Sequence, residues 1–446
     1  MAINALVFRK DLYSEHMDEA SFLYENRLSW LRDEEVSWLD LEELDVRMDA
    51  HLDALVVGGQ VAVDLCQASL EEAEPGLLHI IVRLYCRLRE ISLLAGVWKK
   101  LDFNDEEKSK AIADALKWDC PAEWHNALLS AFQNKNKKMF SILLPAIVYQ
   151  QVVDARSLCE CLPVATEQQK TDLIWSIGNA GDSSCNAAVS SYLTSPFFPL
   201  AEQTALSLMK MGDINVIERM QLPIDRIPYI TALGGNKQYA LQLIDIARQG
   251  KADADCLIAI GLTGEVSAIS FLLNYLKHPD YADSAAWGLQ LISGASLYED
   301  IHVADEVEEA DLFDHELEDF KKGKLPRNVD GLDFGDQKHQ LTIKQDIWLK
   351  WFQDNESRFT ADMRYRNGEA YTPSTILDVL VNFQTPYKIR NLVYEEFVIR
   401  YNLDVFLAVD DMLEKQKIAL NSVYQWINDK ADFKPGAWYF SGFEQT

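Results

Sequence analysis

The chain has 446 residues, of which 48% are hydrophobic and 25% charged, so it can bury a large core as several domains or as one elongated repeat array. Its 70 Asp and Glu against 42 Lys and Arg give a formal net charge of −28. Phosphate backbones and anionic membranes repel that charge, which disfavours binding to nucleic acid or to a membrane, whereas a basic protein partner is attracted.

The cysteine pattern and the N-terminus indicate a reducing compartment. The seven cysteines are odd in number and include no C-x-x-C, so we interpret them as small buried hydrophobes and not as a disulfide framework. The first residues, MAINALVFRKDLYSEHMDE, carry charge where a signal peptide needs an apolar core. No apolar run reaches the length of about 18 residues that a membrane helix needs. We therefore expect a soluble, cytoplasmic protein.

The N-terminal region, residues 1–119, has the spacing of amphipathic helices. A first helix is predicted in LDLEELDVRMDAHLDALVVGG and ends at Gly58 and Gly59; its apolar face is made of Leu41, Leu44, Met48, Leu52 and Leu55. A second and more deeply buried helix is predicted in PGLLHIIVRLYCRLREISLLAG, which Pro75 and Gly76 introduce.

Three aspartates, Asp45, Asp49 and Asp53, are spaced to lie on one face of that first helix, with His51 offset from them. Two interpretations remain open. The row is either a cation site or a solvated face opposite the leucines, and the solvated face is favoured.

The central region, residues 120–298, repeats a helix, a glycine turn and a second helix at a nearly constant interval. Glycine closes a helix in the left-handed conformation, and Asp182, Asp213 and Asn236 follow as helix N-caps. The apolar positions Ala240, Leu243, Ile244 and Ala247 recur 29 residues later as Ile269, Leu272, Leu273 and Leu276. We predict an all-α fold, an α-solenoid of HEAT-like helical pairs. The turn glycines are Gly181, Gly212, Gly234 with Gly235, Gly264 and Gly294.

An acidic insertion, residues 299–340, interrupts the helical pattern after Ala285, Leu289 and Ile292 complete the last regular helix. From Glu299 to Asp319 there are 11 acidic residues and no Lys or Arg, so we expect a solvated, partly disordered linker loop. If it contacts a basic partner, the expected contact residues are Asp305, Glu306, Glu308, Glu309 and Asp311.

The C-terminal helical module, residues 341–446, returns to helical periodicity. A loop, MRYRNGEAYTP, and a helix pair in STILDVLVNFQ and PYKIRNLVYEEFVIRYN follow its first helix. The final segment, FKPGAWYFSGFEQT, has two interpretations: it caps or packs back along the array, or Trp438, Tyr439 and Phe440 are exposed anchors for a partner protein. The first helix is predicted to share one face among Ile343, Ile347, Trp348, Trp351 and Phe352.

Three stretches together resemble an uncharacterised bacterial HEAT-like repeat family that is often encoded beside type VI secretion genes. They are LDVRMDAHLDALVVGG, AAWGLQLISGASL and the tryptophan helix followed by MRYRNGEAYTP. The chain departs from that pattern at Ser293, where Thr is commoner, and in the separation of Trp348 from Trp351. The resemblance implies a bacterial cytoplasm with secreted toxins nearby. It carries over no catalytic residue, because none is established for the family.

The sequence lacks the usual catalytic signatures. No G-x-S-x-G, H-E-x-x-H, G-x-x-x-x-G-K-[ST] or G-x-G-x-x-G occurs, and the one His-Glu dipeptide, His315 with Glu316, is too little for a diiron site. Asp330, Asp333 and Asp336 lack the EF-hand order. We therefore predict no catalytic residue, metal or cofactor.

The functional expectation is a protein-binding module, because a curved array of helices offers an extended surface to a partner. Within that class the specific hypothesis is an immunity protein that neutralises a basic type VI effector. Alternatives are an effector-loading adaptor or chaperone, a scaffold of the secretion machine, and an enzyme with a site across the repeats. The sequence leaves the partner and the oligomeric state open.

Overall fold

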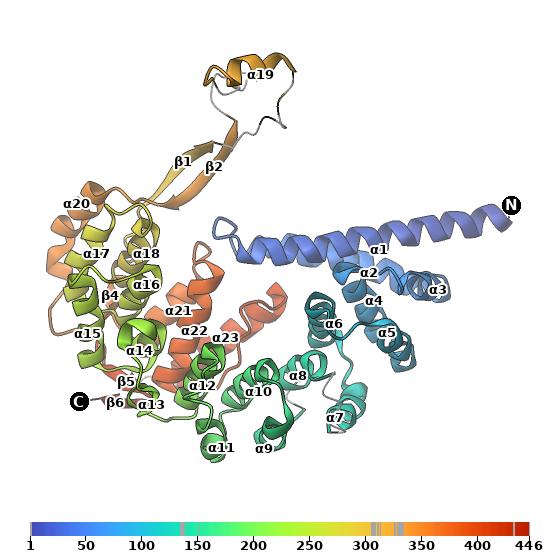
Figure 1. Cartoon of the computed structure of the whole chain (residues 1–446), viewed down its shortest axis with the longest axis horizontal. Coiled ribbons are helices and arrows are strands. Elements are labelled where there is room, and N and C mark those ends of the chain that lie inside the picture. The colour runs from blue at the N-terminus through green and yellow to red at the C-terminus, as the bar shows by residue number, and fades with distance from the viewer. Residues whose placement is uncertain are drawn as a thin grey trace.

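The computed structural model describes residues 2–133, 139–150, 152–304, 334–430 and 433–445, and within 305–333 only 309, 312, 314–324 and 327. Most of these residues are helical, as predicted, and the strands among them form three two-stranded antiparallel sheets. The helices follow an arc, with the C-terminal helices inside it (Figure 1). Among the helices described, none has both the length and the apolarity needed to cross a membrane.

The N-terminal helices begin the arc, and the helix α1 also runs across its open side (Figure 1). The antiparallel neighbour α2 buries Leu41, Leu44, Met48, Leu52 and Leu55, which confirms the predicted apolar face. The second predicted helix begins at Pro75 as expected but ends at Leu88, where Arg89 adopts a left-handed conformation. The helices are α1 (Ala2–Arg32), α2 (Leu41–Gly58), α3 (Gln60–Ser69), α4 (Pro75–Leu88), α5 (Leu94–Lys100) and α6 (Glu106–Asp119).

The central region continues the arc with two rows of helices. The even-numbered helices from α4 to α18 pack one on the next in chain order, and the odd-numbered helices between them lie towards the outside (Figure 1). The central helices are α7 (His125–Gln133), α8 (Phe140–Tyr149), α9 (Ala155–Cys159), α10 (Glu167–Ala180), α11 (Asn186–Ser190), α12 (Phe198–Lys210), α13 (Val216–Met220), α14 (Pro228–Gly234), α15 (Lys237–Arg248), α16 (Ala254–Thr263), α17 (Ile269–Tyr275) and α18 (Ala282–Ser293).

The apolar stripes predicted for this region face the core. All four stripe residues of α15 are buried, as are Ala285, Leu289 and Ile292 of α18. On α17, Leu272 and Leu273 are buried, with Leu276 just beyond its end, whereas Ile269 is only partly buried. A single helix pair cannot bury all of its own apolar side chains. Each pair is therefore stabilised by packing against its neighbours along the arc.

The glycine turns mostly have the predicted conformation. Gly181, Gly264 and Gly294 are left-handed C-caps, and Gly212 also has a positive φ. Gly235 contradicts the pattern, since its φ is −73°; it is instead a close approach, where a Cβ would lie 2.4 Å from the Thr231 carbonyl oxygen.

The polar residues that follow the glycines were predicted to be helix N-caps, and the structure shows a different outcome for each. Asn236 caps α15 as predicted, accepting hydrogen bonds from the backbone N–H groups of Gln238 and Tyr239. Asp182 caps a short 3₁₀ turn by accepting from the Ser184 N–H. Asp213 accepts from the Asn215 N–H within a turn, so its predicted role as the N-cap of an α-helix is wrong.

The close packing at Gly294 gives a testable difference between two left-handed glycines. Gly181→Ala is expected to cost about 1 kcal/mol, the strain of a left-handed alanine, because nothing lies within 4 Å of its Cβ position. Gly294→Ala is expected to cost about 2 kcal/mol more, because its Cβ would lie 2.5 Å from the Asn367 backbone and displace that loop. Urea unfolding of both variants measures the difference, and equal losses would contradict the packing argument.

The acidic insertion is framed by secondary structure. Strands β1 (Tyr298–Ala304) and β2 (Gly335–Leu341) pair antiparallel from Tyr298 with Leu341 to Ala304 with Gly335. This hairpin projects from the arc and carries the helix α19 (Asp314–Phe320) beyond its outer end (Figure 1). The prediction of a loop is therefore wrong for these segments, because β1 pairs with β2 and α19 is helical.

Helices α21, α22 and α23 of the C-terminal module lie on the inner side of the arc, whereas α20 packs beside α17 on its outer side (Figure 1). Helix α22 packs against α12 and α14 of the array and against α1, while α23 packs against α2. Trp348 of the first helix is fully buried, but Ile343 and Ile347 are each 37% exposed, so the predicted shared face is wrong for these two. The elements are α20 (Gln345–Asn355), β3 (Tyr365–Arg366), β4 (Glu369–Ala370), α21 (Pro373–Val381), α22 (Tyr387–Tyr401), α23 (Leu413–Asp429), β5 (Trp438–Phe440) and β6 (Phe443–Gln445).

Candidate functional site

The three predicted aromatic anchors lie inside the molecule. Trp438, Tyr439 and Phe440 form β5 and are all buried, so the expectation that they are exposed is wrong. The physical reason is that β5 packs on α22: the rings of Tyr439 and Tyr401 are 5.3 Å apart, and the Arg364 guanidinium lies 3.8 Å from the centre of the Trp438 ring. The alternative interpretation, in which the C-terminal segment is a cap, fits these contacts, which lie within the C-terminal module.

The predicted acidic contact residues are only partly within the described structure. Glu309 is described and is exposed to solvent. The other four lie outside the described residues: Asp305, Glu306, Glu308 and Asp311.

A cluster of buried arginines, which we name the arginine clamp, joins the C-terminal module to the array; it consists of Arg364, Arg366 and Arg400. Arg364 Nε donates to the Thr263 carbonyl at 2.7 Å, and Arg366 Nη2 donates to the Leu262 carbonyl at 2.6 Å. Arg400 Nη2 donates to the Ala232 carbonyl at 2.6 Å. These acceptors are carbonyls in the last turns of α16 and α14, where a cation is favoured by the helix dipole.

One buried carboxylate forms ion pairs with two of the three arginines of the clamp. Glu396 of α22 is fully buried, with its Oε2 2.7 Å from Arg366 and its Oε1 2.5 Å from the Tyr371 hydroxyl and 3.5 Å from Arg364. The loop MRYRNGEAYTP, which carries the family resemblance, therefore has a structural role in docking the module onto the array.

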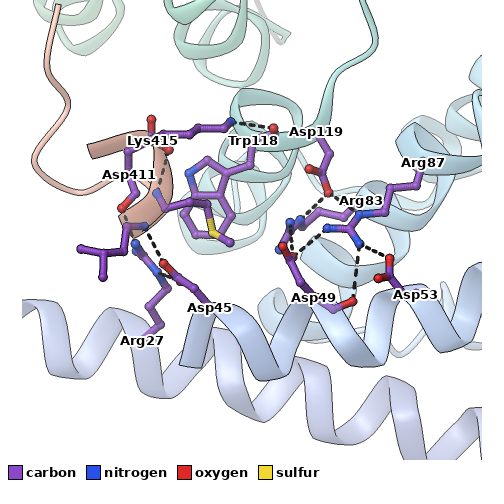
Figure 2. A network of polar contacts seen from close by, with 12 residues as sticks. Arg27, Asp45, Asp49, Asp53, Arg83, Arg87, Trp118, Asp119, Asp411 and Lys415 are labelled. Atoms are coloured by element: carbon purple, nitrogen blue, oxygen red, sulfur yellow. Dashed lines mark hydrogen bonds and ion pairs between the residues drawn. The ribbon is translucent and has the colours of Figure 1, made fainter. Parts of the chain in front are cut away.

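The aspartates of the predicted row form ion pairs with arginines (Figure 2). Asp45 contacts Arg27 at 2.5 Å and is 5% exposed; burial raises the pKa of Asp45, and Arg27 only partly opposes this. Asp49 contacts both Arg83 and Arg87, at 2.8 and 2.7 Å. Among the described residues no group of three or more His, Cys, Asp or Glu could hold a metal ion.

The solvated interpretation of the same row is wrong for Asp45 but fits Asp53 and also Asp49, whose side chain is 42% exposed. The Asp53 side chain is 76% exposed and contacts Arg87 at 2.8 Å. Asp45 instead faces the C-terminal module, where it accepts a hydrogen bond of 2.7 Å from the Leu413 N–H (Figure 2). Arg27 also donates to the carbonyls of Asp410 and Asp411. This N-terminal network, centred on Arg27 and Asp45, therefore joins helices α1 and α2 to the start of α23 and the segment before it.

A polar cavity of about 300 Å³ lies between the array and the C-terminal module. Burial lowers the pKa of Lys117 on its wall, but Asp410, 2.9 Å away, and Asp411 outweigh this and raise it. Burial raises the pKa of Asp114, which accepts a hydrogen bond of 2.9 Å from Tyr24. The Lys117–Asp410 ion pair at this cavity therefore joins the N-terminal region to the C-terminal module.

A second cavity, of about 400 Å³, is built differently, and we name it the acidic cavity. It lies where the loop between α1 and α2, the start of α18, the base of the β1–β2 hairpin and the segment after α21 meet. Its wall carries four carboxylates, from Glu34, Glu35, Asp40 and Asp283, against a single ammonium group. Its other side chains include Trp287, Tyr298, Lys338, His339, Phe383 and Gln384.

The cation of the acidic cavity, Lys338, forms an ion pair with a carboxylate of the loop between α1 and α2. Its Nζ lies 2.8 Å from Glu35. That hydrogen bond raises the pKa of Lys338, and Asp283 and Glu34 raise it further. The sequence analysis missed this site, because its residues belong to four segments that are separated along the chain and share no motif. The one available signal was the density of acidic residues on both sides of Trp38.

Comparison with known proteins finds no family model, no curated protein and no solved structure that matches the chain. The family resemblance and its link to type VI secretion therefore stay predictions.

Proposed function

We propose that the protein is a protein-binding helical-repeat module whose partner is basic. The observation that carries this proposal is the unequal burial of charge. Among the described residues six arginines and two lysines are buried, against five carboxylates. The buried cations are Arg27, Arg83, Arg364, Arg366, Arg390, Arg400, Lys117 and Lys210, and the buried carboxylates are Asp45, Glu265, Glu395, Glu396 and Asp411.

This burial leaves the surface more negative than the net charge of −28 indicates. A surface of one sign raises the rate at which an oppositely charged protein associates, and it repels nucleic acid and anionic lipid. Charge therefore selects the class of partner, while shape and local contacts select the individual protein.

We also propose that the arc is an α-solenoid of HEAT-like pairs, which the ordered packing of the even-numbered helices supports. Its inner side is occupied by the protein's own helices α21, α22 and α23, so a partner meets the outer surface, the hairpin arm or the acidic cavity (Figure 1). The specific proposal is an immunity protein that neutralises a basic type VI effector in the bacterial cytoplasm. It rests on the family resemblance together with the charge.

Affinity capture from the native cell at low salt, followed by reconstitution from purified components, tests the proposal. We expect one stoichiometric partner with a basic surface, and binding that weakens steeply as the salt concentration rises. Protection of growth when the two are co-expressed supports neutralisation, whereas loss of partner export on deletion of this protein supports an adaptor. A reconstituted partner that is acidic, or binding that salt does not affect, would contradict the proposal.

A further inference from the structure

We infer that the projecting end of α1, residues 5–12, binds the α1 helix of a second copy of this chain as an antiparallel pair. Every residue from 5 to 12 is exposed to solvent, and this end of α1 extends beyond α2 and α3 (Figure 1). A helix is stabilised mainly by the packing of its apolar face, and these turns have no such packing within the described part of the chain. Four of the exposed side chains are large and apolar, namely Leu6 at 48%, Val7 at 50%, Phe8 at 66% and Leu12 at 36%.

This end of α1 carries an apolar stripe that differs from the face packed inside the molecule. Phe8 and Leu12 are four positions apart and Ala5 is three positions before Phe8, so the three lie on one side of the helix. The packed face is marked by Met17, which contacts Cys66 of α3 at 3.9 Å. Met17 lies roughly 140° around the helix from Leu12. The stripe of Ala5, Phe8 and Leu12, which we name the outer stripe, is therefore left uncovered by the chain's own packing.

The charges along α1 indicate both the partner and its direction. Residues 5–10 carry only basic charges, whereas residues 11–19 carry four acidic side chains and no Lys or Arg. An antiparallel pair of identical helices places the basic segment of each copy beside the acidic segment of the other. A parallel pair would place like charges together. The six charged side chains are all exposed, and none forms a salt bridge within the described residues: Arg9, Lys10, Asp11, Glu15, Asp18 and Glu19.

A second copy suits this surface better than a lipid bilayer does. Glu15 and Glu19 follow Leu12 by three and seven positions, so they lie on the same side of the helix as the outer stripe. An interfacial membrane helix instead has Lys and Arg on its polar face, and anionic headgroups repel these two carboxylates. In an antiparallel pair the same carboxylates meet the basic segment of the second copy.

The size of the contact sets its strength. An overlap of residues 5–19 is about 22 Å long, which is small for a stable interface, so we expect a dissociation constant on the order of 10 µM. Each copy has a net charge of −28, but salt at physiological concentration screens charges beyond about 8 Å. Because the projecting ends meet away from the arcs, the charges at the contact outweigh the repulsion between the two bodies (Figure 1).

Sedimentation velocity of the full chain at physiological salt, from about 1 to about 200 µM, tests the inference. We expect the average mass to rise from that of the monomer towards twice that mass. Phe8→Glu is expected to raise the dissociation constant at least about tenfold, because it places a carboxylate in the outer stripe. Leu241→Glu, at a 41% exposed position of α15, is the matched control and should leave association unchanged. Both positions are exposed, so both variants should keep the circular dichroism of the unchanged protein.

A charge exchange tests the antiparallel direction. One variant combines Arg9→Glu with Lys10→Glu, and the other combines Asp11→Lys with Glu15→Lys. Each variant alone is expected to associate at least about tenfold more weakly, because its two segments then carry charges of one sign. An equimolar mixture should recover association, since every contact between the two variants again joins opposite charges.

The outcomes decide between a second copy and other occupants. A protein that stays monomeric up to about 200 µM, or a dimer that Phe8→Glu does not weaken, would overturn the inference. A mixture of the charge variants that stays monomeric would overturn the antiparallel pair. Sedimentation of the unchanged protein, but not of Phe8→Glu, with phosphatidylcholine vesicles would assign the outer stripe to a lipid surface instead. None of these results depends on the basic partner proposed above.

Discussion

Glu396→Ala is expected to destabilise the protein by about 3–5 kcal/mol, because it leaves two buried guanidinium groups without a carboxylate. Glu396 is fully buried, and its two oxygens serve Arg366, Arg364 and Tyr371. In the low-dielectric interior the arginines cannot exchange this partner for water. The substitution therefore weakens the contact that docks the C-terminal module onto α14 and α16.

Urea unfolding followed by circular dichroism measures this effect, with Glu369→Ala as the matched control. Glu369 belongs to the neighbouring strand β4, and its side chain is 74% exposed and 3.6 Å from Arg358. An exposed pair of this kind contributes about 0–1 kcal/mol. Glu396→Gln, which keeps a hydrogen-bonding oxygen, should fall between the two. Losses of equal size for the two alanine variants would contradict the importance of the buried clamp.

Arg27→Ala is expected to have the second large effect, a loss of about 3 kcal/mol of stability, because it leaves the buried Asp45 carboxylate without its cation. The Arg27 side chain is fully buried, stacks on Trp118 with 4.8 Å to the ring centre and donates to Asp45 and to two carbonyls of the segment before α23 (Figure 2). The substitution removes these bonds together. Helices α1 and α2 are then expected to loosen from the C-terminal module while the rest of the array stays folded.

Hydrogen exchange locates this loosening, in addition to the stability measured by denaturant. The amides of residues 410–416, including the Leu413 N–H that donates a hydrogen bond to Asp45, should exchange faster than in the unchanged protein. Arg47→Ala is the control, because Arg47 lies in α2 but makes only an exposed contact of 3.5 Å to Glu43. Unchanged exchange in 410–416 would show that Arg27 does not hold α1 and α2 to the C-terminal module.

Local features of the sequence predicted a large part of the secondary structure. The stripe from Leu41 to Leu55 and the closing glycines Gly181, Gly264 and Gly294 were correct, because helical spacing and left-handed caps depend on residues within a few positions of one another. Where a long-range contact decides, as in the pairing of β1 with β2, the local pattern was wrong.

The candidate site could not be predicted in the same way. Asp45 was recognised as one of a row of aspartates, but its partner is Arg27 and its second contact is Leu413, far along the chain. The acidic cavity depends on similar distant meetings, such as Glu35 with Lys338. Many carboxylates and cations could pair in such a chain, and composition does not rank the pairs.

The sequence by itself determined a helical array with an acidic character, because periodicity, caps and net charge are properties of neighbouring residues and of their sum. Only the tertiary structure decided that helices α21, α22 and α23 lie inside the arc, that arginines are buried within it and that carboxylates gather around one cavity (Figure 1). The physical reason is that buried ion pairs form between whichever groups the packing of distant helices brings within a few ångströms.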